Sequence, residues 1–483
     1  MPDRFARSRA HQARAHALIP GGAHTYAKGD DQLPEGMPVV LARGQGCHVW
    51  DVDGNEYIEY GMGLRAVTLG HAEPRVNRAA RRAMDAGLNF TRPAAIELEA
   101  AEVLADLVPC AERVKFCKDG SSATTAAVKL ARAATGRDLV AVCAAHPFLS
   151  QDDWFIGTTP MDAGVPEAVK ALTVSFPYGD AQALRDLFGR HPGQIAAVVM
   201  EATRGADDPT AYMAEVREAC QASGAVFVLD EMITGFRWHA RGAGYLFDVQ
   251  PDLATFGKAL ANGFSASALV GRADLMDLGG LDTPEARVFL LSATHGAETV
   301  ALGAAAEAMR ITRDEDAPAT MHRQGARLRR GVAEAVARHG LGDHFGTAGR
   351  DCNLVFYTRD AAGEASQPFR TLFLQECVSR GLLAPSFVVS AAHTDADIDK
   401  SVEIVDEALA VYAQAIDAGT TDGFLRGRPV QPVFRPRAGL VWTGGRPRPP
   451  AAPAPGASGD GAVPGPPAVP SPTPPLAARP SHP

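Results

Sequence analysis

Two ionisable residues follow neighbouring strand-like segments of the chain. Asp230 ends the apolar run AVFVL (225–229), and Lys258 follows the apolar run LATFG (253–257), 28 residues beyond Asp230. In open α/β sheets, ligands bind just beyond the carboxyl ends of the strands. Taken alone, Asp230 is best explained as a helix cap and Lys258 as a solvated side chain. Together, the two residues indicate a binding site that uses both charges.

An acid and a lysine in this arrangement satisfy the requirements of pyridoxal 5'-phosphate (PLP) chemistry. The lysine forms a Schiff base with the cofactor, and the acid keeps the pyridine nitrogen protonated, so that the ring accepts electrons from the substrate Cα. Once the substrate displaces the lysine, its amine can carry the proton. The spacing therefore predicts PLP bound covalently through Lys258, with Asp230 at the ring nitrogen.

A third segment offers a place for the cofactor's phosphate. Asp119-Gly120-Ser121-Ser122 stands between the strand-like run VKFC (114–117) and an Ala-rich helical pattern. Small residues at a helix N-terminus present backbone N–H groups and hydroxyls to an anion. A plain capped helix start explains the same residues, so the segment is a weak signal by itself.

These residues need elements that bring them together, and such elements alternate from about 70 to 310. Short, continuous, β-branched runs separated by Ala-rich amphipathic patterns predict an α/β fold with a doubly wound, mainly parallel sheet. The runs are VKFC (114–117), LVAVC (139–143), IAAVVME (195–201) and AVFVLD (225–230). We expect residues 71–310 to form the large PLP-binding domain.

The segments on either side of this region predict a smaller domain and a tail. Residues 39–60 contain two β-rich runs joined by Asp53-Gly54-Asn55, which is a hairpin signal. We expect residues 1–70 and 311–424 to build the small α/β domain. Residues 425–483 are rich in Pro, Gly and Ala, and we predict a disordered tail because they cannot bury enough apolar surface to order themselves.

The composition limits the function classes. The chain has 483 residues and a net charge of −9 without a long basic run, which argues against nucleic acid or an anionic membrane surface as a partner. It has no apolar stretch of membrane-spanning length and no secretory signal. Its seven cysteines include no C-x-x-C pair, which is typical of a reduced, cytoplasmic protein.

Longer motifs are similar to those of the class III (fold type I) aminotransferases, in the glutamate-1-semialdehyde 2,1-aminomutase-like branch. The resemblance runs from about residue 18 to 415 and is most specific in DEMITGFR (230–237) and PDLATFGKALANG (251–263). Other matching motifs are GCHVWDVDGNEYIEYGMGL, LGHAEP, KDGSSATTAAVKLARAATGRD and SATHGAET. The resemblance implies a PLP-dependent enzyme of fold type I that acts as a homodimer.

The resemblance also implies a role for each matched position. Lys258 matches the Schiff-base lysine, Asp230 the pyridinium partner, and Met232 an apolar residue against one ring face. The other positions implied to contact the cofactor are Gly120, Ser121 and Ser122 at the phosphate, Glu201 near the 3-hydroxyl, and His146.

Three further matches concern the surroundings of the cofactor. Thr294 matches a threonine that reaches the phosphate in the neighbouring subunit, which is the reason to expect a homodimer. Residues 148–165 match a loop that gates the site in the aminomutase. Arg237 matches an arginine with a structural ion-pair role.

The chain departs from the family's pattern at one face of the cofactor. The family has Tyr-His-Gly after the strand that ends near Cys143; here Ala145 takes the tyrosine's place and His146 keeps the histidine's. Either His146 or Phe148 restores the ring stacking, or that face of the cofactor is more open.

Other departures lie at the expected phosphate position and at the expected substrate position. Asp119 stands where Asn or Ser is common, and a carboxylate beside a phosphate is unfavourable unless it is turned away or paired. Lys28 replaces an arginine and Leu64 a tryptophan of the tetrapyrrole enzyme, which argues against glutamate semialdehyde as substrate. The residues that could hold an anionic substrate group, or equally be surface residues, are His24, Lys28, Arg65 and Arg92.

Three functions remain open on these grounds. The leading one is amino-group transfer by an aminotransferase or an aminomutase on a small polar substrate, since both need Lys258 and Asp230. Segments such as HVWDVDGNEYIEY resemble relatives in saccharide and secondary-metabolite pathways, which favours a biosynthetic role. The change at Ala145 permits a different PLP reaction: epimerisation, decarboxylation or an oxidative step. A non-catalytic relative is the third hypothesis, which the retained Lys258 and Asp230 oppose.

Overall fold

The structure, a computed structural model, describes residues 3–203, 205 and 207–435. Its strands are β1 (Leu41–Gln45), β2 (His48–Asp51), β3 (Glu56–Glu59), β4 (Arg113–Cys117), β5 (Leu139–Cys143), β6 (Thr173–Phe176), β7 (Ile195–Met200), β8 (Val226–Asp230), β9 (Leu253–Phe256), β10 (Ser267–Gly271), β11 (Phe345–Ala348), β12 (Val355–Thr358) and β13 (Leu382–Leu383). Its helices are α1 (Ala6–Leu18), α2 (Met62–Arg65), α3 (Pro74–Ala86), α4 (Ala95–Leu107), α5 (Gly120–Thr135), α6 (Asp153–Ile156), α7 (Glu167–Lys170), α8 (Ala181–Arg190), α9 (Thr210–Ser223), α10 (Gly242–Leu246), α11 (Ala273–Met276), α12 (Thr299–Asp314), α13 (Ala317–Arg338), α14 (Gln367–Ser379) and α15 (Asp395–Ala418).

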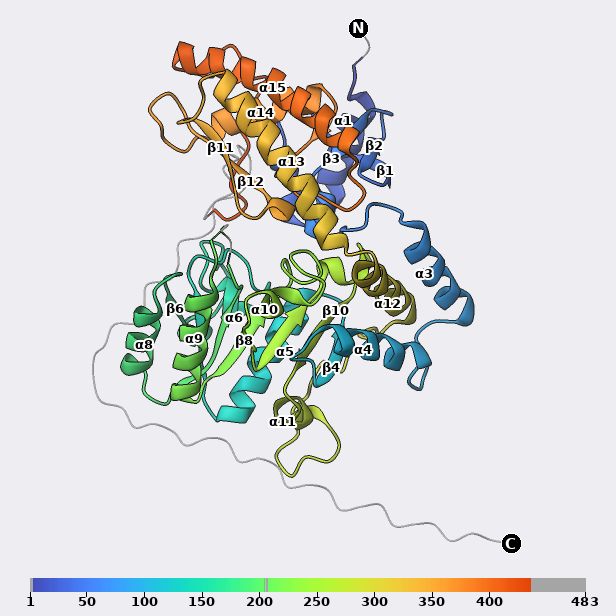
Figure 1. Ribbon diagram of the computed structural model, residues 1–483, viewed down its shortest axis with the longest axis vertical. Coiled ribbons are helices and arrows are strands. Elements are labelled where there is room, and N and C mark those ends of the chain that lie inside the picture. Colours follow the sequence, from blue (N-terminus) through green and yellow to red (C-terminus); the bar gives the residue numbers. More distant parts are fainter. Residues whose placement is uncertain (1–2, 204, 206, 436–483) are drawn as a thin grey trace, which may run out of the picture. The chain divides into compact units, whose positions relative to one another are not determined.

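The largest sheet has seven strands in the order β4-β10-β9-β8-β7-β5-β6 (Figure 1). The neighbouring strands β6, β5, β7, β8 and β9 run parallel. Strand β10 is antiparallel to both β9 and β4. The prediction of a doubly wound, mainly parallel sheet is therefore confirmed.

Helices cover both faces of this sheet because each central strand buries side chains on both sides. Phe227 and Leu229 of β8 belong to one apolar cluster, which includes residues of α4, α8, α9 and α12. Val226 and Val228 belong to another, with residues of α5, α6 and α11. This burial on two faces explains the continuously apolar sequence of β8 up to Asp230.

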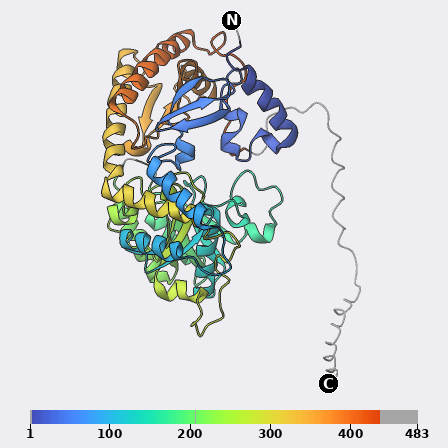
Figure 2. The same cartoon turned by 90° about the vertical axis from the view of Figure 1, so that its right-hand side faces the viewer.

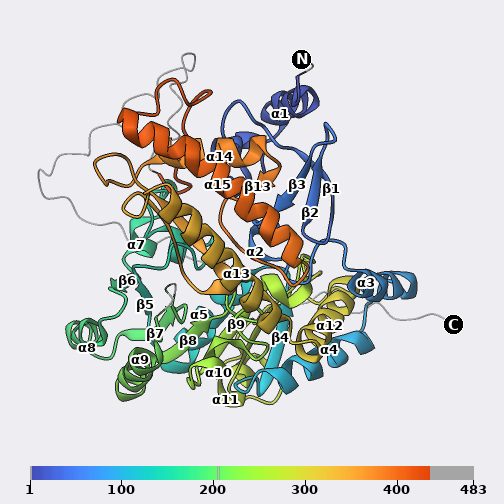
Figure 3. The same ribbon diagram turned by 45° about the horizontal axis from the view of Figure 1, so that its top comes forward.

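A smaller sheet joins segments from distant parts of the chain. Strands β1, β2 and β3 form an antiparallel meander, and the short β13 pairs in parallel with β3 (Figure 3). The predicted hairpin is confirmed, since β2 and β3 flank residues 53–55. In Figure 2 the blue strands of this sheet lie beside the orange C-terminal helices. Residues of β3, β13, α13, α14 and α15 share one apolar cluster.

The beginning of the expected tail is packed against this cluster. Val430 is buried, and its N–H donates to the hydroxyl of Thr371 (2.9 Å). Arg435 forms an ion pair with Asp31 (2.5 Å). The packed part of the chain thus extends through residues 425–435, and the rest of the predicted tail, 436–483, lies outside the described residues.

Two further features concern the chain as a whole. All seven cysteines are unpaired thiols. In the part of the chain that the structure describes, no helix has both the length and the apolar character required to cross a membrane.

Candidate active site

Asp230 lies at the carboxyl end of β8, where the apolar run stops. The side chain is buried, and its Oδ1 accepts hydrogen bonds from the N–H of Met232 (2.8 Å) and the hydroxyl of Thr255 (3.4 Å). No described residue donates to Oδ2. Burial raises the pKa of this carboxyl to about 6, although the charge of Lys258 and the two hydrogen bonds oppose the rise.

Lys258 lies just beyond the end of the neighbouring strand. The register of β8 and β9 pairs Asp230 with Thr255, so both residues emerge at the same edge of the sheet. Lys258 has a φ of +45° and begins a 3-10 turn. Its ammonium has no hydrogen bond or ion pair with a described residue. Burial lowers its pKa, while the negative charges of Asp230 and Glu201 act in the opposite direction.

Met232 connects the turn after β8 to two glycines of the site. A Cβ added to Gly257 would lie 2.6 Å from the Met232 sulfur and 2.5 Å from the Ser267 hydroxyl. A Cβ added to Gly120 would lie 2.9 Å from the same sulfur. Because ordinary contacts are longer than these distances, both positions need glycine to let Met232 approach. This packing brings the Lys258 turn and the start of α5 to the same side chain.

The start of α5 holds the residues expected at the phosphate. Asp119 caps the helix, since its carboxylate accepts hydrogen bonds from both the N–H and the hydroxyl of Ser122 (2.9 Å each). Asp119 is therefore paired, as a carboxylate near a phosphate must be. The backbone N–H groups of Gly120 and Ser121 have no acceptor among the described residues. They remain available to an anion at the positive end of the helix.

The loop of residues 148–165 is attached to this same helix start. The N–H of Gln151 donates to the buried hydroxyl oxygen of Ser121 (3.0 Å), and the indole N–H of Trp154 donates to Thr125 (2.8 Å). The expected gating loop thus contacts the expected phosphate site.

Glu201 and His146 follow β7 and β5 and are both buried. The N–H of Glu201 donates to Nδ1 of His146 (3.1 Å), which assigns the ring proton to Nε2. The His146 ring lies 6.0 Å from the Tyr178 ring, between centroids. The structure therefore brings His146 and Glu201 together, with the charge of Glu201 acting on Lys258.

The position of the missing tyrosine is open to solvent. Ala145 is exposed. Phe148 is 46% exposed and packs against the rings of Phe155 and Phe434, at 6.0 and 6.4 Å between centroids. Since Phe148 has other aromatic partners, these contacts argue against Phe148 as the stacking residue, which leaves stacking by His146 or a more open cofactor face.

Asn262 is a residue of this site that the sequence analysis did not single out. Its Oδ1 accepts hydrogen bonds from the N–H groups of Thr68 (3.0 Å) and Leu69 (2.9 Å), and its Nδ2 donates to the carbonyl of Gly70 (3.0 Å). Asn262 thereby fixes the Lys258 turn against a segment 194 residues earlier. The only sequence signal is a polar residue at the end of the ALAN run.

Arg237 does not form the expected ion pair with a described residue. Its buried guanidinium donates to the carbonyl oxygens of Arg65 (2.6 Å) and Val389 (3.4 Å), and no described residue pairs with its Nε. Burial lowers its pKa to about 10. Arg237 thus fastens backbone segments together instead of neutralising a carboxylate of the described chain.

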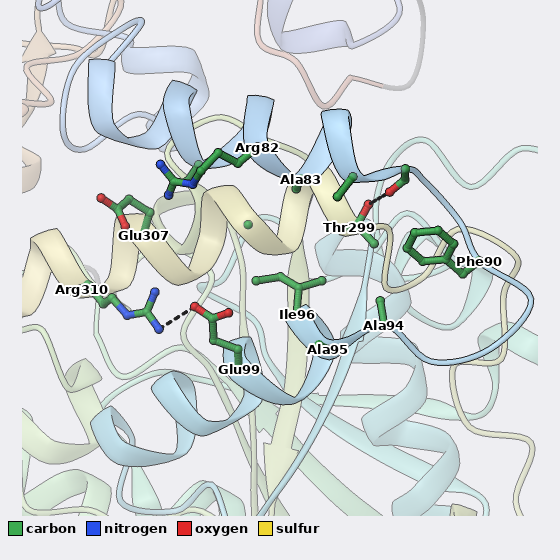
Figure 4. Close-up of a pocket in the computed structure, with 14 residues that line it drawn as sticks. Arg82, Ala83, Phe90, Ala94, Ala95, Ile96, Glu99, Thr299, Glu307 and Arg310 are labelled. Atoms are coloured by element: carbon green, nitrogen blue, oxygen red, sulfur yellow. Dashed lines mark hydrogen bonds and ion pairs between the residues drawn. The ribbon is translucent and has the colours of Figure 1, made fainter.

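Thr294 belongs to the segment that precedes α12. It is exposed and has no hydrogen bond to a described residue. Beyond it, α12 borders a cavity of about 390 Å³, whose other walls are α3, α4 and the segment between them (Figure 4). Small apolar side chains and Phe90 line much of this cavity, and none of the expected cofactor contacts is among its lining residues.

The site described above fits PLP on three observations. Lys258 is half-buried and has no hydrogen-bond or ion-pair partner among the described residues, so its amine is available for a covalent bond. No residue in the described part of the chain donates to Oδ2 of Asp230, so this oxygen can accept the hydrogen bond of a protonated ring nitrogen. The N–H groups of Gly120 and Ser121 can bind the phosphate, while Ser122 is already held by Asp119.

Comparisons with known proteins agree with this fit. The family model "Aminotransferase class-III" matches residues 30–346. The chain is 35% identical over 435 residues to glutamate-1-semialdehyde 2,1-aminomutase of Chloroflexus aggregans, covering 84% of this chain and 98% of that protein. It is 33% identical to the enzyme of the same name from Halobacterium salinarum, with 82% and 98% covered.

Solved structures of the same fold cover most of the chain. The FumI protein of Sphingopyxis sp. MTA144, solved with PLP, has a TM-score of 0.78 at 28% identity and covers 87% of this chain and all of that one. A glutamate-1-semialdehyde aminomutase from Pseudomonas aeruginosa PAO1 has a TM-score of 0.73 at 20% identity, with 85% and 96% covered, and shows the shared fold. The chain belongs to the class III aminotransferases, and it is a PLP-dependent aminotransferase or aminomutase of fold type I.

Proposed function

We propose that this chain transfers an amino group to or from a small polar substrate, with Lys258 as the proton-carrying lysine and Asp230 as the partner of the cofactor's ring nitrogen. The observation that carries the proposal is that two side chains at adjacent strand ends, Lys258 and Asp230, have polar atoms without hydrogen-bond partners among the described residues. Within residues 3–203, 205 and 207–435, Lys258 has no hydrogen-bond or ion-pair partner, and one oxygen of Asp230 has no donor. Bound PLP supplies an electron sink for the bond that breaks at the substrate Cα.

The residues of the chain have separate tasks in this proposal. The ionised carboxylate of Asp230 keeps a proton on the ring nitrogen. The lowered pKa of Lys258 increases the fraction of neutral amine, which can take a proton from the substrate carbon and return it elsewhere. Gly120 and Ser121 bind the phosphate through backbone N–H groups, and Met232 packs against the ring. Glu201 and His146 are the remaining polar side chains of the site.

The exposed Ala145 supports a second, different reaction with the same cofactor. A more open cofactor face admits a different substrate orientation, and the orientation decides which bond at Cα is broken. Epimerisation, decarboxylation or an oxidative step is the alternative function on this ground. Loss of the substrate carboxylate, or exchange of the Cα hydrogen without amine transfer, would identify it.

The test of the proposed function combines trapping with a half-reaction. Reduction of the purified protein with borohydride, followed by peptide mapping, is expected to find a pyridoxyl group on the peptide that contains Lys258. Addition of an amino donor without a carbonyl acceptor is expected to yield one keto product per site. A trapped cofactor without keto product contradicts the aminotransferase, and absence of the pyridoxyl group contradicts every PLP reading.

We propose further that the enzyme is a cytoplasmic homodimer in which Thr294 reaches the other subunit's cofactor. Exposed apolar side chains gather on α3, α4 and the segment between them, beside the cavity of Figure 4: Met84, Leu88, Phe90 and Leu98. The first residue of α12, Thr299, donates to the carbonyl of Gly87 (3.1 Å), so the segment from Thr294 leads directly to this surface. A second copy of the chain would cover it.

The double variant Phe90→Asp, Leu98→Asp is expected to shift the sedimentation coefficient to that of a monomer and to weaken cofactor retention. Charges placed on an apolar interface oppose association. The matched control is Leu281→Asp, at a residue that is 83% exposed on a different segment. A native protein that sediments as a monomer with full cofactor retention would contradict the dimer.

A further inference from the structure

A cluster of side chains able to bind a metal lies outside the candidate active site, where the smaller sheet meets the last helix. The sulfur of Cys47, a ring nitrogen of His48 and a carboxylate oxygen of Asp397 all lie within 4.8 Å of one another. Cys47 is buried, and the other two residues are half-buried. Thiolate, imidazole and carboxylate are the protein ligands that Zn²⁺ binds. This combination of three ligand types is therefore a candidate zinc site.

A tight turn lets two neighbouring residues face the same point. Consecutive side chains within a strand point to opposite faces of the sheet. Cys47 is not in a strand, because Gly46 and Cys47 form the turn between β1 and β2. The strands pair Gln45 with His48 across this turn, and Gly46 has the positive φ, +59°, that such a turn requires. The turn thus frees the Cys47 sulfur from strand alternation and lets it approach the His48 ring.

The start of α15 supplies the third ligand in a fixed orientation. Oδ2 of Asp397 accepts hydrogen bonds from the N–H (2.9 Å) and the hydroxyl (2.6 Å) of Thr394, the residue that caps this helix. Oδ1 of Asp397 lies 2.9 Å from Nε2 of His48. The capping contacts therefore hold one carboxylate oxygen and direct the other at the histidine. Because this contact spans 349 residues, no spaced motif in the sequence indicates it.

His48 has a carboxylate oxygen beside each of its ring nitrogens. Besides the contact of Nε2 with Asp397, Nδ1 lies 2.9 Å from Oε1 of Glu56, a diagonal neighbour on β3. A neutral imidazole has one N–H, so it can donate to only one of the two carboxylates. A doubly protonated ring would satisfy both but would give the Cys47 thiol no part in the cluster. A metal ion on Nε2 uses all three ligands and leaves the Nδ1 proton facing Glu56, and such an outer carboxylate is typical of ligating histidines.

We propose that Cys47, His48 and Asp397 bind Zn²⁺ and that Glu56 is the positioning residue that orients the His48 ring. Binding releases the proton of the Cys47 thiol, and a water molecule takes the fourth position of a tetrahedral site. Zinc bonds of about 2.0–2.3 Å place ligand atoms roughly 3–4 Å apart, so the cluster needs only a small contraction. The ion ties the β1–β2 turn to the start of α15 and stabilises the folded chain, since it binds the folded state. This inference is independent of the proposed function.

The first measurement is the binding of zinc chloride to the full-length holoenzyme after treatment with a chelator. Isothermal titration is expected to show saturable binding of one ion per chain, and Tm should rise with the zinc concentration. Co²⁺ then reports the ligands directly. A tetrahedral cobalt site with a thiolate ligand is expected to give d–d absorption at wavelengths longer than those of the cofactor, together with a sulfur-to-metal charge-transfer band in the difference spectrum.

Variants assign the ligands and the positioning residue. Cys47→Ser should abolish the charge-transfer band, and Glu56→Gln should keep this band while weakening zinc binding by about 10–100-fold. His48→Gln removes a ligand and should weaken binding more than Glu56→Gln does. The matched control is His339→Gln, at a half-buried histidine that contacts the carboxylate of Asp406 (3.0 Å) and that no described cysteine joins. This variant should bind zinc like the native protein.

The proposal is overturned if the native protein binds no zinc in a saturable way, or if His48→Gln binds it as tightly as the native protein. It is also overturned if the cobalt spectrum is that of an octahedral site, or if the charge-transfer band persists in Cys47→Ser, because the sulfur would then belong to another cysteine. Should the buried position of Cys47 prevent Cys47→Ser from folding, the affinities of His48→Gln and Glu56→Gln decide, since both residues are partly exposed to solvent.

Discussion

Replacement of Lys258 by alanine is expected to reduce amino-group transfer by roughly 10²–10⁴-fold or more. Lys258 is both the expected covalent anchor and the only described amine at the end of β9, so one substitution removes both tasks. Alanine at φ +45° carries about the same backbone strain as lysine, and the fold should remain intact. The measurement is the single-turnover rate, with circular dichroism to verify folding.

The control and the rescue make this prediction specific. Lys129→Ala removes an exposed lysine from α5 and should leave the rate unchanged. Added methylamine should restore part of the activity of Lys258→Ala, since a free amine can carry the proton but lacks the proximity of a tethered one. Full activity of Lys258→Ala, or a pyridoxyl group trapped on a different lysine, would refute the assignment.

Asp230→Asn is expected to lower the rate of amino-group transfer and to raise the free energy of unfolding of the cofactor-free protein. The amide cannot balance the positive charge of a protonated ring nitrogen, and removal of one such electrostatic partner costs about 10²–10³-fold in rate. In the cofactor-free protein the same change removes a buried carboxylate. We therefore expect a higher free energy of unfolding for cofactor-free Asp230→Asn at neutral pH.

The pH dependence follows from the pKa of this carboxyl. Burial raises it from an ordinary value of 3.8 to about 6, so folding favours the uncharged form. Its contribution to stability is complete below pH 4 and is lost as the pH rises through 6. At pH 7.5 the neutral amide should thus gain about 1–3 kcal/mol, and at pH 4 it should gain nothing. Denaturant unfolding of the two cofactor-free proteins at both pH values measures the difference.

Asp230→Glu is the matched control, because it keeps the charge and changes only the position. It should lose activity without gaining stability. An equal gain for the amide at both pH values would show that the benefit is unrelated to the ionisation of Asp230. A loss of stability at neutral pH would mean that the carboxylate has a partner in the cofactor-free protein.

The sequence by itself determined the large sheet and the two charged residues at its edge. The strands of the sheet and the two charged residues can each be recognised from a short stretch of sequence. Val226–Leu229 is apolar at every position because β8 is covered on both faces, and that pattern also marks the strand end where Asp230 stands. The spacing of Lys258 from Asp230 follows from a helix and a turn between neighbouring parallel strands. The family motifs around both residues supported the PLP site that their spacing had predicted.

Only the tertiary structure decided which charges surround Lys258 and which groups are available. The contact of Arg237 with Arg65 spans 172 residues, and that of Asn262 with Thr68 spans 194. No local pattern predicts such contacts, because they depend on how separate elements pack. The same holds for Ser122, whose N–H and hydroxyl are held by Asp119, and for Val430, which packing buries although its surroundings have the composition of a tail. Composition and spacing identify residues able to do chemistry, whereas long-range packing decides which of them face one another.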